Sequence, residues 1–206
     1  MRSRAQLKQL LDDLHRRYGR LDFLATSALS IPHRYRRSED REIAAFVTAS
    51  LAYGNVKQIH ASTESALEAM GPSPSRFVRD FDPERDAARF QRFVHRFNSG
   101  IDIALLCYLL QQAIRTRGSL QAFFLQGYDP GHEDVGHALI SFVERALSLD
   151  VSPFYPSGAL PAEAGVRFFF PSPAKGSACK RLNLLDRKST RLNSSHIQKS
   201  RMPSSA

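Results

Sequence analysis

The segment IDIALLCYLLQQAIRTRG, residues 101–118, most constrains how this chain can fold. Apolar residues occupy most of its positions as far as Ile114, so a helix formed here is apolar nearly all round and must be buried by other elements. Apolar residues recur at helical spacings in other segments on both sides, and no segment alternates convincingly with a period of two. We therefore predict an all-α fold, an orthogonal helical array in which helices cross a central helix at different angles.

The other predicted helices have recognisable starts and stops. Ser38 with Glu39 and Asp40 marks one N-terminus, Asp82 with Pro83 marks another, and Gly71–Pro72 marks a C-terminus. Between such signals we predict helices ending at Tyr18, from Ser38 to Gly54, from Val56 to Met70, from Asp82 to Asn98, from Ser119 through Phe124, and from Val135 to Leu147. Prolines and glycines between Asp150 and Ala164 predict a long loop.

The apolar pattern stops at Leu185. Residues 186–206, which begin DRKSTRLNSSH, resemble the translation of an adapter used in short-read sequencing. We expect them to form a disordered, artefactual tail and exclude them from fold reasoning. Residues 1–185 are then expected to form a single helical domain that lacks its C-terminal part, and to be inactive in this truncated form.

Composition and charge limit the classes of protein to which this chain can belong. No run approaches the roughly 20 apolar residues of a membrane span, and the charged N-terminus has no signal-peptide core, which predicts a cytoplasmic protein that does not bind membranes. Cys107 and Cys179 are far apart and outside any CxxC pattern, so we expect reduced thiols, no metal site and no cofactor. The formal net charge is +9, of which residues 186–206 contribute +4, so the remaining +5 is only a mild bias toward a polyanionic partner.

Four blocks carry a family resemblance that covers nearly all of the chain before Asp186. They read IPHRYRRSEDREIAAFVTASLAYGNVKQI, FVHRFNSGIDIALL, GSLQAFFLQGY and FFFPSPAKGSACKRLNL, and together they resemble an uncharacterised bacterial family, domain of unknown function family 2400. The sequence departs from the family pattern at Ala28–Leu29, where the family favours Asp-Pro. It also lacks the Pro-Leu-Asp-Thr-His segment that normally follows the last block.

A more distant resemblance suggests a DNA-repair activity. The stretch GSACKRLN is similar to the Gly-Val-Gly-Arg-Lys-Thr-Ala-Asn junction of helix-hairpin-helix DNA glycosylases of the endonuclease III class, with Gly176, Lys180 and Asn183 in register. The resemblance implies a DNA repair protein of the glycosylase or lyase type that binds double-stranded DNA. Its catalytic aspartate would belong to the absent Pro-Leu-Asp-Thr-His. The sequence departs again at Ala52, where glycosylases usually carry a glutamine.

The residue types at this junction suit such a function. Small residues at Gly176, Ser177 and Ala178 would let backbone N–H groups at a helix start approach a phosphate. A partly desolvated Lys180 would have a lowered pKa and could attack the sugar C1′ as the catalytic nucleophile. Lys175 and Arg181 would contact phosphates. The simpler alternative is a helix N-terminus with solvated basic residues.

Two further groups of polar residues are candidates. His33, Arg34 and Arg37 form either a loop that faces a polyanion or a solvated turn, and Asn55 and Gln58 are candidates to face a base. A second cluster could hold a metal or a general base, but such groups more often form an internal hydrogen-bond network, and we propose no metal there. This cluster comprises His95, Arg96, Asn98 and Asp102.

Three functions remain open on this basis. The first is a glycosylase or lyase that acts through Lys180, and the second is a non-catalytic helical protein that binds nucleic acid. The third is a helical scaffold for a protein partner, which gives the segment Lys175–Arg181 no role. Steep salt dependence of duplex binding separates the first two from the third.

Overall fold

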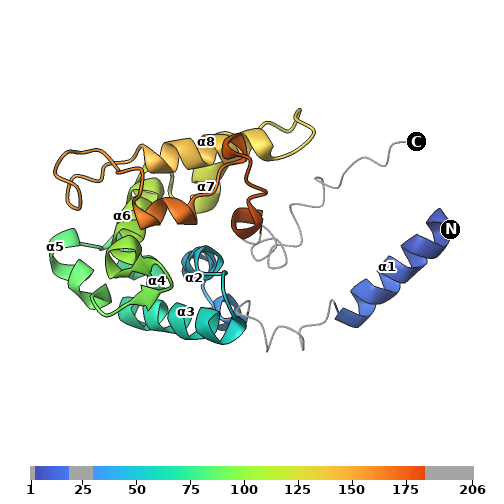
Figure 1. Cartoon of the computed structure of the whole chain (residues 1–206), viewed down its shortest axis with the longest axis horizontal. Helices are drawn as coiled ribbons and strands as arrows, with labels where there is room; N and C mark the ends of the chain where they lie inside the picture. Colours follow the sequence, from blue (N-terminus) through green and yellow to red (C-terminus); the bar gives the residue numbers. More distant parts are fainter. Residues whose placement is uncertain (1–2, 19–29, 184–206) are drawn as a thin grey trace.

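The computed structural model describes residues 3–18 and 30–183, and it confirms the all-α class (Figure 1). Residues 186–206, predicted to be an artefactual tail, and the departure at Ala28–Leu29 lie outside the described residues. The α-helices are α1 (Arg4–Tyr18), α2 (Ser38–Ser50), α3 (Val56–Met70), α4 (Pro74–Arg79), α5 (Pro83–Asp86), α6 (Gly100–Arg117), α7 (Leu120–Leu125) and α8 (Gly136–Leu147). Short 3-10 helices η3 (Pro32–Arg34), η4 (Ala87–Phe90), η5 (Gly165–Phe169) and η6 (Pro173–Lys175) and strands β1 (Val94–His95) and β2 (Asn98–Ser99) complete the described elements, and residues 180–183 are again helical.

Helix α6 is central, as the sequence predicts. Residues from Ile103 to Ala113 on it are almost all buried, and α4, α5, α7, α8, η4 and η5 all contact it. In Figure 1, α7 and α8 lie above α6 while α3 and α4 lie below it. A capping box starts the helix, because the Asp102 carboxylate accepts a hydrogen bond from the backbone N–H of Ser99 at 2.9 Å.

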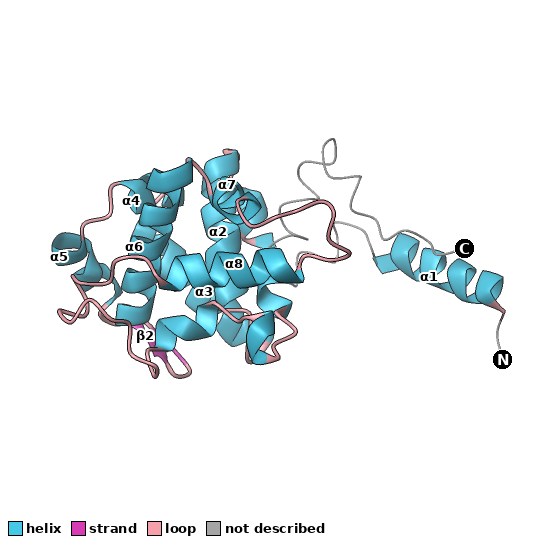
Figure 2. Ribbon diagram, turned by 90° about the horizontal axis from the view of Figure 1, so that it is seen from above, coloured by secondary structure: helices cyan, strands magenta, loops and turns pink. Residues whose placement is uncertain are grey.

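The helix predicted from Asp82 to Asn98 is wrong beyond Phe90. The chain instead forms a two-stranded antiparallel hairpin in which His95 pairs with Asn98 (Figure 2). Phe93 is buried as expected, but Val94 is 69% exposed and Phe97 is 60% exposed. The spacing of the phenylalanines alone favours a helix. The hairpin forms instead because it lets the buried polar groups of its two strands form hydrogen bonds with other segments.

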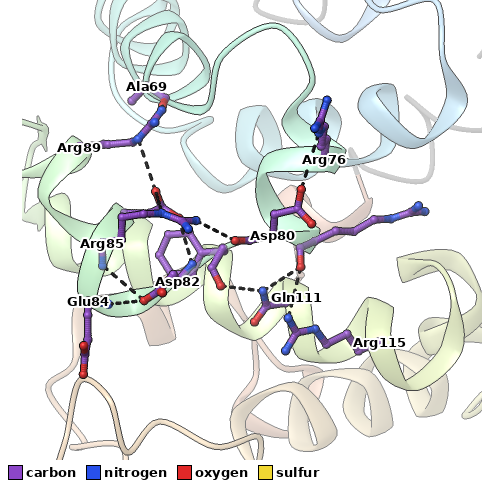
Figure 3. A network of polar contacts seen from close by, with 12 residues as sticks. Ala69, Arg76, Asp80, Asp82, Glu84, Arg85, Arg89, Gln111 and Arg115 are labelled. Atoms are coloured by element: carbon purple, nitrogen blue, oxygen red, sulfur yellow. Dashed lines mark hydrogen bonds and ion pairs between the residues drawn. The ribbon is translucent and has the colours of Figure 1, made fainter.

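A polar network ties the loop between α4 and α5 to α6 (Figure 3). The Gln111 side-chain amide is buried and donates to the carbonyl oxygens of Arg79 at 3.0 Å and Phe81 at 2.8 Å. Arg85 pairs with the buried Asp86 at 2.6 Å, and this hydrogen bond lowers the pKa of the Asp86 carboxyl. These bonds satisfy the loop backbone and fix the short helix α5 against the core.

Composition led to expectations about the two cysteines and about membrane-spanning helices. Cys107 and Cys179 are both buried free thiols. Among the described helices, none combines the length and the apolar character that crossing a bilayer requires.

Candidate nucleic-acid interface

An aromatic cluster joins three segments that are far apart in the sequence. Tyr53, which follows α2, stacks on Phe97 with ring centroids 5.5 Å apart and an interplanar angle of 24°. The ring of Phe168 in η5 meets Tyr53 edge to face at 4.7 Å and Phe97 at 4.6 Å. The loop after α2, the hairpin and η5 therefore meet at one place on the molecule.

Buried hydrogen bonds hold the hairpin to this cluster. The Tyr53 hydroxyl donates to Asn98 Oδ1 at 2.5 Å, and Asn98 Nδ2 donates to the carbonyl oxygen of Gly165 at 2.9 Å. His95 Nε2 lies 3.0 Å from the Tyr53 carbonyl oxygen, and its Nδ1 lies 2.8 Å from Ser62 Oγ. Because a carbonyl only accepts, Nε2 carries the proton and Nδ1 accepts from the serine hydroxyl.

The electrostatics agree with a structural role for this network. Burial raises the pKa of Tyr53 to about 12 and lowers the pKa of His95, so both groups are neutral near pH 7. His95 and Asn98 are thus parts of an internal network, the interpretation the sequence favours, whereas Asp102 caps α6 through Ser99 and Arg96 is exposed. The described ranges 3–18 and 30–183 contain no group of three His, Cys, Asp or Glu side chains placed to hold a metal.

Arg181 packs inward from the last described helical turn. Its guanidinium carbon lies 3.6 Å from the centroid of the Phe168 ring and 5.5 Å from that of Tyr53, and Nη2 donates to the Phe168 carbonyl oxygen at 2.5 Å. Burial lowers the pKa of Arg181, but a guanidinium stays protonated in proteins. Its main contact is therefore with the aromatic cluster, where we expected a phosphate contact.

The predicted junction has a different local structure from the one expected. Gly176 has φ +72° and ends η6, and the next helical residue is Lys180, so the small residues do not start a helix. The N–H groups of Gly176 and Ser177 bond to the carbonyl oxygens of Pro173 and Ser172 at 2.9 and 3.3 Å. Lys180 is exposed, so the partial burial expected for it is absent. Exposed side chains also project from Lys175 and Ala178.

Asn55 and Gln58 lie beside the hairpin. Asn55 caps α3, since its Oδ1 accepts from the N–H of Gln58 at 2.9 Å, and both side chains are exposed. A Cβ atom added at Gly54 would lie 3.4 Å from Cδ of Arg96, which places the hairpin next to the start of α3. The structure thus brings Asn55 and Gln58 to the same side of the fold as Arg181.

The structure does not bring the other predicted basic residues to this place. Arg34 forms an ion pair with Glu64 at 2.6 Å, and Arg37 lies 3.8 Å from the Glu39 carboxylate. Arg37 and half-buried His33 precede α2, whereas Tyr53 follows it. The 13 residues of α2 separate the two ends by about 20 Å.

The aromatic cluster lies among segments that are entirely free of acidic residues. Residues 51–61, 91–99 and 165–183, which we call the Tyr53 face, contain no Asp or Glu. Their basic residues are Lys57, Arg92, Arg96, Arg167, Lys175, Lys180 and Arg181. Sequence reasoning missed Phe97 and Arg96 as surface residues because it placed them on a helix. The only available signal was Asn98-Ser99-Gly100, which is poor helix-forming sequence.

The structure defines a helical protein in which three segments that lack acidic residues meet at Tyr53. The chain belongs to the family described as "Protein of unknown function (DUF2400)", whose model matches residues 28–193. This match confirms the family resemblance read from the sequence blocks. No curated protein and no solved structure matches the chain, and the resemblance to DNA glycosylases stays a prediction.

Proposed function

We propose that this protein binds nucleic acid, most simply double-stranded DNA, through the Tyr53 face. The observation that supports the proposal is the combination of basic side chains with a complete lack of carboxylates in three segments that meet around Tyr53. Cations that approach a phosphate backbone release its counterions, and this term supplies most non-specific affinity for DNA. A scaffold for a protein partner gives no reason to exclude acidic residues from this face.

Salt dependence tests this proposal. We expect the log of the association constant for duplex DNA to fall linearly with log salt, and Lys57→Ala and Lys180→Ala each to reduce that slope by about 0.9. Arg117→Ala is the matched control, because Arg117 is an exposed cation at the far end of α6, about 25 Å from the hairpin. Binding that is independent of salt, or an equal effect of all three variants, would contradict the proposal.

A lyase activity of Lys180 is a second candidate function on the same face. Lys180 is exposed and lies next to Arg181, which anchors the helical turn to the aromatic cluster, so a sugar carbon can reach the amine. The burial expected to activate the amine is absent, however, and the amine must first give its proton to solvent. At an abasic site the amine would condense with the C1′ aldehyde and release water, and borohydride would reduce the resulting imine to a stable amine.

Borohydride trapping on abasic-site DNA separates this activity from simple binding. We expect the protein to form a covalent adduct, and Lys180→Arg should lower the adduct yield at least about 100-fold. Because arginine keeps the charge, the salt slope of that variant should stay the same. If no adduct forms, or if Lys180→Arg still forms one, Lys180 is not a nucleophile and the binding function stands alone.

A further inference from the structure

Phe97 is an unusual residue for the surface of a small helical protein. It lies in the two-residue turn between β1 and β2, packs one side on Tyr53, and is still 60% exposed. Large aromatic side chains on a surface usually mark a binding site, since burying this one would be favourable. Part of the Phe97 ring therefore stays accessible to a ligand although Tyr53 and Phe168 both contact it.

Arg96, the other turn residue, has a backbone conformation that suits glycine. Its φ is +56°, in the left-handed region that L-residues with a Cβ rarely adopt. In a two-residue hairpin turn the first position commonly holds glycine for this reason. Strain of this kind concentrates at functional sites, and the side chain that follows from this backbone lies against Gly54, where Nη1 of Arg96 would be 3.4 Å from an added Cβ atom.

We propose that the hairpin tip, Arg96 and Phe97, binds an unpaired base of DNA. The base stacks on the open side of Phe97, and Arg96 contacts the phosphate next to it. Stacking on an aromatic side chain tolerates any base, because every base has a π face, and the cation beside the ring holds the backbone. This inference rests on the proposed DNA-binding function and gives it a preferred ligand, a duplex that contains an unpaired nucleotide.

A planar, charged ligand fits the tip better than a lipid surface does. The exposed ring continues a stack of aromatic rings, and the Tyr53 face around it carries cations without carboxylates. An amphipathic membrane site would instead need a continuous apolar face along a helix. Vesicles are nevertheless the appropriate competitor in the test.

The test compares a fully paired duplex with the same duplex carrying one unpaired 2-aminopurine. We expect the wild-type chain to prefer the second DNA by about tenfold and to quench its fluorescence. Phe97→Leu should abolish both the preference and the quenching, so that the variant binds the two DNAs equally. Phe97→Tyr, which keeps an aromatic ring, should retain both. Arg96→Gly should weaken binding to both DNAs and raise the unfolding midpoint, because it relieves the strained φ.

The outcomes distinguish a failure of the proposed DNA-binding function from a failure of the inference about the hairpin tip. If the wild-type chain binds neither DNA at low salt, the proposed function fails together with this inference. If it binds both DNAs equally, or if Phe97→Leu keeps the preference, only the inference about the tip is overturned. Vesicles containing phosphatidylserine that compete for wild type but not for Phe97→Leu would also overturn it, because they would identify the tip as a membrane site.

Discussion

Gly100→Ala is expected to destabilise the folded protein by about 3 kcal/mol. A Cβ atom at this position would lie 1.9 Å from the carbonyl oxygen of Phe90 and 2.6 Å from its carbonyl carbon. Both atoms belong to the backbone, and the same carbonyl accepts the Phe93 N–H at 2.8 Å. The turn after η4 and the start of α6 must therefore separate to admit one methyl group. Chemical denaturation followed by circular dichroism measures the loss.

Gly136→Ala provides the matched control, because Gly136 is also the first residue of a helix, α8. There the added Cβ would meet only the side chain of exposed Asp134, at 2.9 Å, and that side chain can rotate away. We expect a change of no more than about 0.5 kcal/mol. Equal effects of the two substitutions would show that the close approach of Phe90 to α6 is absent in solution.

The helices were predictable where local signals and burial act together. Ser38 is the first residue of α2 and Gly71 ends α3 with φ +80°, as predicted, whereas α4 with its Ser73 cap was not predicted. The predicted features depend on residues within one helical turn of each other, so a single sequence reveals them. The apolar character of α6 likewise predicts its central position.

The hairpin was not predictable because its stabilising contacts are remote. Asn98 contacts residues 45 and 67 positions away, and His95 contacts residues 33 and 42 positions away. The spacing of Phe90, Phe93 and Phe97 imitates a helical face, and nothing local reveals that the Asn98 side chain finds its partners in other segments. Long-range hydrogen bonds decide the conformation here.

The residues of the candidate site were also predictable only in part. Sequence reasoning placed polar candidates at Asn55 and Gln58, which the structure puts beside the hairpin. It could not foresee that Arg181 turns inward, since that depends on the position of the Phe168 ring. A basic residue after a loop has the same sequence signature whether it faces solvent or an aromatic ring.

Asn98→Ala should have the second large effect, a loss of about 3 kcal/mol in the free energy of unfolding. The side chain is 1% exposed and joins two segments, since it accepts from the Tyr53 hydroxyl and donates to the Gly165 carbonyl. Alanine leaves the Gly165 carbonyl without this donor and opens a small cavity, while the Tyr53 hydroxyl keeps only the His95 carbonyl oxygen, at 3.1 Å, as an acceptor. Each unsatisfied group costs about 1–3 kcal/mol.

Tyr53→Phe tests the hydrogen bond between Tyr53 and Asn98 separately from the hydrogen bond between Asn98 and Gly165. It removes the hydroxyl but keeps the ring that stacks on Phe97 and leaves the bond from Asn98 to Gly165 intact, so we expect a loss of only about 1 kcal/mol. In the double variant the effects should be less than additive, because the hydroxyl and the amide oxygen share one bond. Strict additivity would mean that this bond contributes nothing to stability.

If the hairpin positions Phe97 for a base, Asn98→Ala should also remove the preference for the unpaired nucleotide. This loss should be seen at temperatures where the variant is still folded, whereas Tyr53→Phe should keep the preference.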